Sequence, residues 1–317
     1  MLPVNLRWHP TNRPWVIAHR GASGLLPEHC LPGYALAIEQ GADVIEPDLV
    51  ASRDGVLYAR HDLGLARSTD IATRAEFAAL RCAGPDGQLD WWVADLDSTQ
   101  IDALRVIQPW PQRPHHRDGV FRVPRFREVL TLLLMERQRR GRPLLVYPEL
   151  KHPQYFLDRG LDLVALLIGD LHACGLNSPQ APLLVQCFDA DCLQRVRLQT
   201  GLRVVQLAVD LPEMDSQVDG YGIDKSALEG QLGRAFIDAA HAKGRFVHAW
   251  TFRDDQPHAD RSTQDEYRHA FMQGCDGVFS DFPASALAAR DSELAWKECQ
   301  APGKVLNSMA FASGSGA

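Results

Sequence analysis

Short apolar runs alternate with amphipathic segments along most of the chain. Many amphipathic segments end at a glycine, the residue that commonly follows the last turn of a helix. The expected helices cover 32–40, 98–106, 124–139, 157–174, 191–199, 228–243 and 264–273, and the expected strands cover 16–20, 43–50, 144–151, 183–188, 203–209, 221–224, 246–252 and 277–281. About eight such units predict an α/β fold, namely a closed TIM (β/α)8 barrel; a doubly wound open sheet is the alternative.

The alternation breaks between about residues 65 and 119. This stretch contains many turn residues, the pair Trp91–Trp92 and the proline-rich run PWPQRPHH. It is too long for a simple loop in a compact domain, so it predicts a small insertion subdomain after the second strand. A hairpin through Asp54-Gly55 is expected to lead into it. Residues 1–317 then form one barrel domain, with a disordered tail at about 312–317.

Charged side chains fall at the carboxyl ends of the expected strands, where (β/α)8 barrels place their active sites. Glu46 and Asp48 lie two residues apart on one strand and so point to the same side. Two buried carboxylates this close repel each other and lose hydration unless a cation lies between them. Glu149, on the next strand, offers a third ligand, and such hard oxygens suit Ca²⁺ or Mg²⁺. The alternative is that these acids form buried salt bridges with Arg20 and Lys151.

His19 and His61 end the first strand and the hairpin. Histidine titrates near neutral pH, so one ring can serve as general base and the other as general acid. A single histidine at a strand end is more often structural, but two of them flank a carboxylate pair here. Arg20 and Lys151 are suited to holding a phosphate, the first through a two-pronged fork and the second as a point charge. These residue types together predict a metal-assisted hydrolytic site.

Composition and net charge limit the kinds of molecule that the chain is expected to bind. The net charge of −7 argues against nucleic acid, because phosphate-backbone binding usually needs a basic surface. A small phosphoester needs only a few local cations. No run reaches the roughly 18 apolar residues of a membrane span, so no integral membrane segment is expected. Seven cysteines without disulfide-like spacing, and a first segment without an apolar leader, favour the cytoplasm; removal of a signal peptide would make a periplasmic or secreted location compatible.

Several short motifs occur in a fixed order along the chain: HRGA at 19–22, LPE at 26–28, EPD at 46–48, HD at 61–62, PELK at 148–151 and GVFSDFP at 277–283. Together they resemble the glycerophosphodiester phosphodiesterase family over about 16–283. The resemblance implies a TIM barrel that hydrolyses glycerophosphodiesters to sn-glycerol 3-phosphate and an alcohol. One departure is Cys30, where the family often has threonine, a better hydrogen-bond partner for the start of a helix.

The resemblance also implies a role for each residue of the site. A divalent cation, Ca²⁺ or Mg²⁺, would bind the three carboxylates, and the two histidines would form the acid–base pair. Phe188 and Trp250 would line the pocket, although both are equally natural as core residues. The substrate and its phosphate would contact Arg20, Lys151, Glu28, Phe188 and Trp250.

Two other functions fit part of the pattern. A related barrel phosphodiesterase would act on lysophospholipids and would need an apolar ridge at the barrel mouth. A non-catalytic protein that binds a phosphoester would have no need of a paired acid and base. For the hydrolase, the nucleophile is either the neighbouring glycerol hydroxyl, which would give a cyclic phosphate, or a water molecule. The sequence specifies neither the leaving alcohol nor the oligomeric state.

Overall fold

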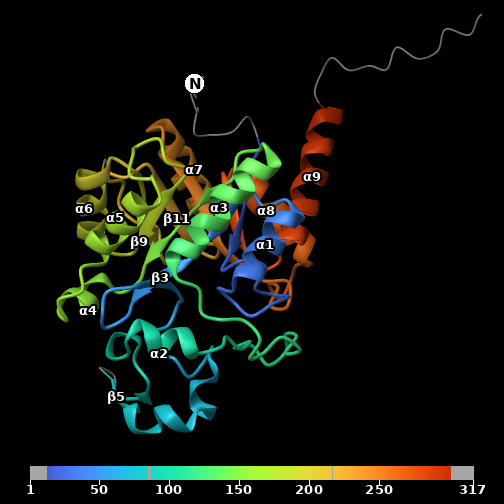
Figure 1. Cartoon of the computed structure of the whole chain (residues 1–317). Coiled ribbons are helices and arrows are strands. Elements are labelled where there is room, and N and C mark those ends of the chain that lie inside the picture. Colours follow the sequence, from blue (N-terminus) through green and yellow to red (C-terminus); the bar gives the residue numbers. More distant parts are fainter. Residues whose placement is uncertain (1–12, 85–86, 216, 301–317) are drawn as a thin grey trace, which may run out of the picture.

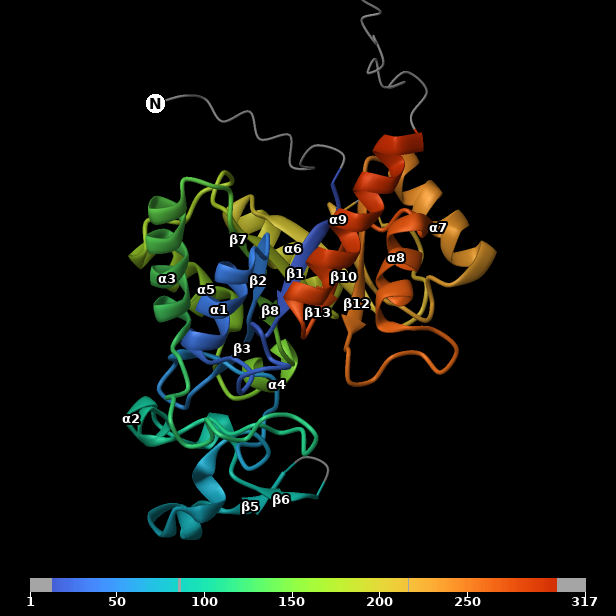
Figure 2. The same cartoon turned by 90° about the vertical axis from the view of Figure 1, so that its right-hand side faces the viewer.

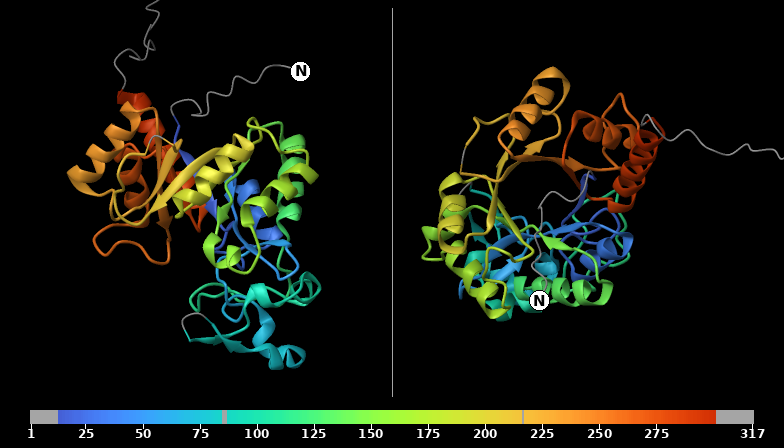
Figure 3. Two further views of the ribbon diagram at one scale, coloured as in Figure 1. Left: turned by 90° about the vertical axis from the view of Figure 1, so that its left-hand side faces the viewer. Right: turned by 90° about the horizontal axis from the view of Figure 1, so that it is seen from above.

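Parallel strands flanked by helices make up most of the molecule (Figure 1), and the main sheet closes into a ring, which confirms the predicted TIM barrel. The computed structural model describes residues 13–84, 87–215 and 217–300. The last strand pairs with the first, and the view from above shows helices outside the ring of strands (Figure 3). In ring order the strands are β1 (Trp15–His19), β2 (Val44–Glu46) with β3 (Asp48–Ala51), β7 (Leu145–Val146) with β8 (Glu149–Leu150), β9 (Leu184–Cys187), β10 (Arg203–Ala208), β11 (Gly220–Asp224), β12 (Phe246–Phe252) and β13 (Gly277–Ser280).

Two strands of the ring are interrupted by a proline. Pro47 separates β2 from β3, and Pro148 separates β7 from β8. A proline has no N–H to donate to the ladder, so regular pairing stops at these positions. Pairing resumes one residue later, where Asp48 lies opposite Glu149. The interruptions therefore fall directly before two of the carboxylates that the sequence assigns to a metal.

Helices cover the outside of the ring (Figures 1 and 2). They are α1 (Leu31–Gln40), α3 (Phe126–Arg140), α4 (Pro153–Leu157), α5 (Leu163–Ala173), α6 (Ala190–Thr200), α7 (Gly230–Ala242), α8 (Thr263–Gln273) and α9 (Pro283–Gln300). Two apolar clusters hold the fold together. The larger is mainly aliphatic and extends into the insertion, and the smaller is rich in aromatic residues such as Trp15, Tyr147, Phe246 and Phe279.

The helices differ from the sequence expectation at two places. The helix expected over 157–174 begins only at Leu163, because Gly160 has a left-handed φ of +74° and Asp162 accepts a hydrogen bond from Val164 N at the start of α5. The helix α9 was not expected. Within the described residues between β10 and β11 no helix forms, so one strand of the barrel lacks its covering helix.

The insertion follows β3 through the predicted hairpin with β4 (Leu57–Ala59). It lies beyond the end of the barrel at which α4 is found (Figures 1 and 2). Its helix α2 ends at Ala103, short of the expected Val106, where Leu104 leaves the helical conformation. The boundaries at about 65 and 119 stay a prediction, and the expected tail at 312–317 lies outside the described residues. The insertion contains η1 (Asp70–Thr73), η2 (Ala75–Leu80), β5 (Cys82–Ala83), β6 (Leu89–Asp90), η3 (Val93–Asp95) and α2 (Ser98–Ala103).

No helix in the described part of the chain is long and apolar enough to cross a bilayer.

The loop after β1 gives a prediction about stability. Gly21 has a φ of +86°, and a Cβ there would lie 2.8 Å from the backbone carbon of Gly33. We expect Gly21→Ala to lower the free energy of unfolding by about 2 kcal/mol or more, because backbone strain and overlap with a fixed backbone act together. The matched control is Gly119→Ala, which has a φ of +73° but no atom within 4 Å of the new Cβ. Urea unfolding should show a clearly smaller loss for the control, and equal losses would contradict the close approach.

Candidate active site

The pairing of neighbouring strands brings the predicted residues to one end of the barrel. His19 at the end of β1 lies opposite Glu46 at the end of β2, and Asp48 lies opposite Glu149. One oxygen from each of Glu46, Asp48 and Glu149 can be chosen so that all three lie within 4.8 Å of one another. All three side chains are buried. The insertion lies at this same end of the barrel, which we call the mouth (Figure 2).

The burial of these carboxylates is electrostatically unfavourable. Burial and then the charges of Asp48 and Glu149 raise the pKa of Glu46 well above its ordinary value. Burial and the charge of Asp48 raise the pKa of Glu149 to about 8, against the opposing effect of Lys151. Burial would also raise the pKa of Asp48, but Lys151 and Arg20 lower it well below the ordinary range. The cluster thus holds more negative charge than its surroundings stabilise, which is the condition that a bound cation relieves.

The salt bridges that the sequence offered as an alternative exist, but they do not complete the cluster. Lys151 Nζ lies 2.7 Å from Glu149 Oε1 and 3.9 Å from Asp48 Oδ1. Arg20 is shared, with Nε 3.1 Å from Asp48 Oδ2 and Nη1 3.0 Å from Glu28 Oε2. When all four carboxylates are ionised, the two fixed cations leave two negative charges without a partner. In the described part of the chain Asp48 Oδ1 accepts no hydrogen bond, so an all-oxygen site for a divalent cation fits these residues.

Arg20 is held in place by its backbone as well as its side chain. Its φ of +59° is left-handed, and its N–H donates to the main-chain oxygen and to Oε2 of Glu46, both at 3.0 Å. Burial opposes the charge, but Glu28 and Asp48 raise the pKa of Arg20 above its ordinary value. The guanidinium is therefore a permanent cation that carboxylates orient beside the carboxylate cluster. This is the placement expected of a group that binds a phosphate.

His19 has one ring nitrogen committed to a buried carboxylate. Its Nδ1 lies 2.6 Å from Oδ1 of Asp281, which directly follows β13. Burial and Arg20 lower the pKa of His19 to about 4, although Asp281 acts in the opposite direction. The ring is therefore neutral at pH 7. With its N–H directed to Asp281, Nε2 carries the lone pair.

His61 has the same arrangement on the insertion side of the mouth. Its Nδ1 lies 2.6 Å from Oδ1 of Asp62, and Oδ2 of Asp62 lies 3.2 Å from a guanidinium nitrogen of Arg67. Burial and Arg20 lower the pKa of His61, whereas Asp48 and Asp62 oppose that shift. The side chain is 30% exposed, compared with 11% for His19. His61 is thus the more accessible of two histidines that are each oriented by a carboxylate.

The two aromatic residues lie on neighbouring parts of the mouth. Phe188 directly follows β9 and is 47% exposed, so the core alternative is wrong for this residue. Its ring packs edge to face against Trp250 on β12, with 5.9 Å between ring centroids. Trp250 is partly buried against the interior layer of the barrel, and its Nε1 has no hydrogen-bond partner among the described residues. Trp250 is therefore both a packing residue and a candidate wall of the site.

Sequence reasoning missed several residues that complete the site. His29 Nε2 lies 2.9 Å from Oδ2 of Asp48, and Gln186 Nε2 donates to Oε1 of Glu46 at 3.0 Å. A signal existed for Gln186, which stands near the end of an expected strand, and for Asp281, which follows the last strand within GVFSDFP. For Arg113 of the insertion, which donates to Asp281 at 2.7 Å, no local signal existed.

The departure at Cys30 has a small structural effect. The sulfur of Cys30 accepts a hydrogen bond from Gly33 N at 3.3 Å, so cysteine still caps the start of α1. Burial raises the pKa of its thiol to about 11, so the group stays protonated. The helix that follows the HRGA and LPE motifs therefore begins where the sequence predicts.

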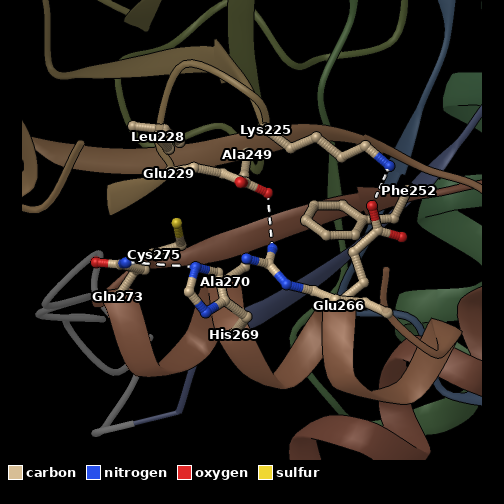
Figure 4. Close-up of a pocket in the computed structure, with 11 residues that line it drawn as sticks. Lys225, Leu228, Glu229, Ala249, Phe252, Glu266, His269, Ala270, Gln273 and Cys275 are labelled. Carbon is tan, nitrogen blue, oxygen red and sulfur yellow. Dashed lines mark hydrogen bonds and ion pairs between the residues drawn. The ribbon is translucent and has the colours of Figure 1, made fainter. Parts of the chain in front are cut away.

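A second hollow lies apart from these residues, between β12 and α8 (Figure 4). Two ion pairs stand in it, one joining Lys225 to Glu266 at 2.5 Å and one joining Arg261 to Glu229 at 2.7 Å. Its lining includes none of the residues that the sequence assigned to catalysis, metal or phosphate. The chemistry therefore belongs to the mouth.

Known proteins resemble the chain along most of its length. The model of the glycerophosphoryl diester phosphodiesterase family matches residues 19–285. The glycerophosphodiester phosphodiesterase GDPD6 of Arabidopsis thaliana is 36% identical over 87% of this chain and 85% of its own length. The glycerophosphodiester phosphodiesterase of Bacillus subtilis is 28% identical over 86% of this chain and 85% of its own.

Solved structures resemble it in fold. A phosphodiesterase of Oleispira antarctica, in complex with the product sn-glycerol-3-phosphate, has a TM-score of 0.67 at 22% identity and covers 88% of this chain and 97% of its own. A glycerophosphoryl diester phosphodiesterase structure from Silicibacter pomeroyi has a TM-score of 0.69 at 22% identity, over 90% of this chain and 95% of its own. At these identities the structures support the barrel fold.

The carboxylate cluster predicts a thermal shift. Ca²⁺ or Mg²⁺ added to chelated protein should raise Tm, since a ligand at 100 times its Kd stabilises the folded state by about 2.7 kcal/mol. In Glu149→Gln the repulsion among the carboxylates is weaker, so Tm without cation should stay the same or rise. The variant also loses a carboxylate ligand, so the rise in Tm on adding the cation should be smaller than in the wild type. The control is Glu76→Gln, an exposed acid on the insertion paired with Arg74. Equal cation shifts in all three proteins would exclude the cluster as the binding site.

Proposed function

The chain belongs to the glycerophosphoryl diester phosphodiesterase family, and on this basis we propose a role in hydrolysis for each residue at the mouth of the barrel. The enzyme cleaves glycerophosphodiesters into sn-glycerol 3-phosphate and an alcohol. The observation that carries the proposal is the placement of two carboxylate-bound histidines beside one cluster of three buried carboxylates. Neither group alone would distinguish a hydrolase from a binding protein, but together they supply charge stabilisation and proton transfer at one point.

The three carboxylates of Glu46, Asp48 and Glu149 would hold the divalent cation, for which we propose Ca²⁺ or Mg²⁺. All three offer oxygen, the donor atom that these hard cations prefer. When bound, the cation supplies Lewis-acid polarisation of a phosphoryl oxygen. Gln186 and the N–H of Arg20 each donate to one oxygen of Glu46, which fixes the orientation of that carboxylate.

Arg20 and Lys151 would bind the phosphate. Both are permanent cations within reach of the carboxylate cluster, and the charge that develops on the phosphoryl oxygens during the reaction would strengthen their contacts. Glu28 would act on Arg20 rather than on the substrate, because its Oε2 lies 3.0 Å from the guanidinium. Phe188 and Trp250 would provide an apolar wall for the carbon atoms of the substrate on the β9 and β12 side of the mouth.

We assign the role of base to His19 and the role of acid to His61. His19 is neutral at pH 7, and its Nε2 can accept a proton from the attacking hydroxyl, whether that belongs to glycerol or to water. Asp281 would then stabilise the imidazolium that forms. His61 is more accessible, and Asp62 opposes the lowering of its pKa, so we assign to this ring the transfer of a proton to the leaving alcohol.

Removal of either ring tests the assignment. His19→Ala and His61→Ala should each lower kcat for glycerophosphocholine by about 10²–10⁴-fold, because each removes one proton-transfer group. The matched control is His115→Ala, since His115 also rests on a carboxylate, with Nδ1 2.8 Å from Asp118, but on the exposed surface of the insertion. Its kcat should stay near the wild-type value. Near-normal turnover in the His19 or His61 variant, with Tm unchanged, would refute the acid–base pair.

We propose the cytoplasm as the compartment. The seven cysteines lack disulfide-like spacing, which is typical of proteins in a reducing environment. Fractionation of the source cells should recover the protein with cytosolic markers, and recovery from a periplasmic or secreted fraction would contradict the proposal.

A further inference from the structure

One segment of the insertion crosses back onto the barrel. Residues 108–113, which we call the strap, contact the loop after β1. Nε2 of Gln108 donates to the main-chain oxygens of Ser23 at 3.2 Å and Leu26 at 3.3 Å, and Arg113 donates to that of Ser23 at 3.3 Å. The hydroxyl of Ser23 in turn donates to the main-chain oxygen of His19 at 2.9 Å. The strap therefore reaches the strand end that carries one of the two histidines.

The Arg113 side chain of the strap also holds the carboxylate that orients His19. Its Nη2 donates to Oδ2 of Asp281 at 2.7 Å, while Oδ1 of the same carboxylate receives His19 Nδ1. Nε of Arg113 donates to Oδ2 of Asp255 at 2.8 Å, and the same Nη2 also donates to Oδ1 of Asp255 at 3.0 Å. The side chain is 2% exposed. Arg253 adds a second guanidinium to Asp281, with Nε 3.2 Å from Oδ2.

The second histidine, His61, is also connected to the strap through the carboxylate that orients it. His61 rests on Asp62, and Asp62 pairs with Arg67. The guanidinium carbon of Arg67 lies 5.2 Å from the ring centroid of Trp110, which belongs to the strap. The guanidinium carbons of Arg113 and Arg253 lie 5.1 and 5.6 Å from the centroid of the same ring. Both histidine–carboxylate pairs thus end on guanidinium groups that pack against one indole.

The charges around this indole argue against an anion-binding site. Arg67, Arg113 and Arg253 face three carboxylates, those of Asp62, Asp255 and Asp281. The cations are therefore neutralised within the protein, and no excess positive charge remains for a ligand. What the arrangement does provide is rigidity, because an arginine that stacks on an aromatic ring and forks to a carboxylate fixes the position of that carboxylate.

We propose that Trp110 and Arg113 are positioning residues, through which the insertion sets the orientation of both histidines. This inference rests on the acid–base roles proposed for His19 and His61. A carboxylate on Nδ1 fixes the tautomer and the ring direction of a histidine, so movement of Asp281 or Asp62 redirects Nε2. The strap does not take part in the carboxylate cluster or in the contacts of Arg20 and Lys151. It should therefore affect the chemical step and leave substrate binding unchanged.

The test separates kcat from KM in variants of the strap. For glycerophosphocholine, Trp110→Ala should lower kcat by about tenfold or more with KM within about threefold, since a misplacement of about 1 Å can lower a rate 10²-fold. Trp110→Phe retains an aromatic face and should recover most of kcat. Arg113→Lys should behave as Trp110→Ala does, because a lysine cannot fork between Asp255 and Asp281. Trp110→Leu, which keeps apolar volume without an aromatic face, replaces Trp110→Ala should that variant not fold.

The matched control is Arg81→Ala. Arg81 stacks on Trp91 with 5.4 Å to the ring centroid, within the same insertion but without a link to either histidine. The kcat of Arg81→Ala should stay within about twofold of the wild-type value even if its Tm changes. A wild-type kcat in both Trp110→Leu and Arg113→Lys would overturn the inference, as would a rise of KM alone, which would make Trp110 a substrate contact. If His19→Ala and His61→Ala lose turnover at the same time, only the inference fails and the proposed function stands.

Discussion

Negative charge buried at the mouth of the barrel is the constraint on which the rest of the site depends. Glu46, Asp48 and Glu149 are placed by strand pairing, which leaves them little freedom to separate. Their mutual repulsion and loss of hydration must be offset by groups that surround them. Two fixed cations, a glutamine amide and a main-chain N–H provide part of that compensation. Once Glu28, which shares Arg20, is counted and all four carboxylates are ionised, two negative charges remain, and a divalent cation would offset them.

The backbone around the cluster is shaped by the same requirement. Arg20, His29 and His152 all have positive φ, with values of 59°, 58° and 46°, in a region that residues other than glycine seldom occupy. Two of them serve the cluster directly, since the Arg20 N–H is turned to Glu46 and the His29 ring to Asp48. Strain of this kind persists only where the surroundings determine the conformation. The close approach of Gly21 to Gly33, which admits no Cβ, allows the loop after β1 to hold that shape.

The parts of the molecule that could be predicted are those governed by short-range pattern. Alternation of apolar runs and helices identified the barrel, and the two-residue spacing of Glu46 and Asp48 identified the carboxylates at the mouth. Errors arose where a local signal for a turn was overlooked, as at Gly160, whose left-handed conformation delays the start of the helix expected from residue 157. Residues such as Asp281 and Arg113 were missed because their roles come from contacts across 262 and 168 residues of chain. No periodicity carries that information.

Strand pairing and contacts between distant segments of the chain place different groups of the site. From its strand ends the barrel itself supplies the carboxylates and the two cations proposed to bind phosphate, so their geometry is fixed by the closure of the ring. The histidines stand on the same strand ends, but the groups that orient them depend on the insertion, through Arg67, Trp110 and Arg113. On the proposed roles, sequence change in the insertion would alter proton transfer without altering the carboxylate cluster. A barrel without its insertion would keep the residues proposed to bind a phosphodiester and lose the groups that orient both histidines.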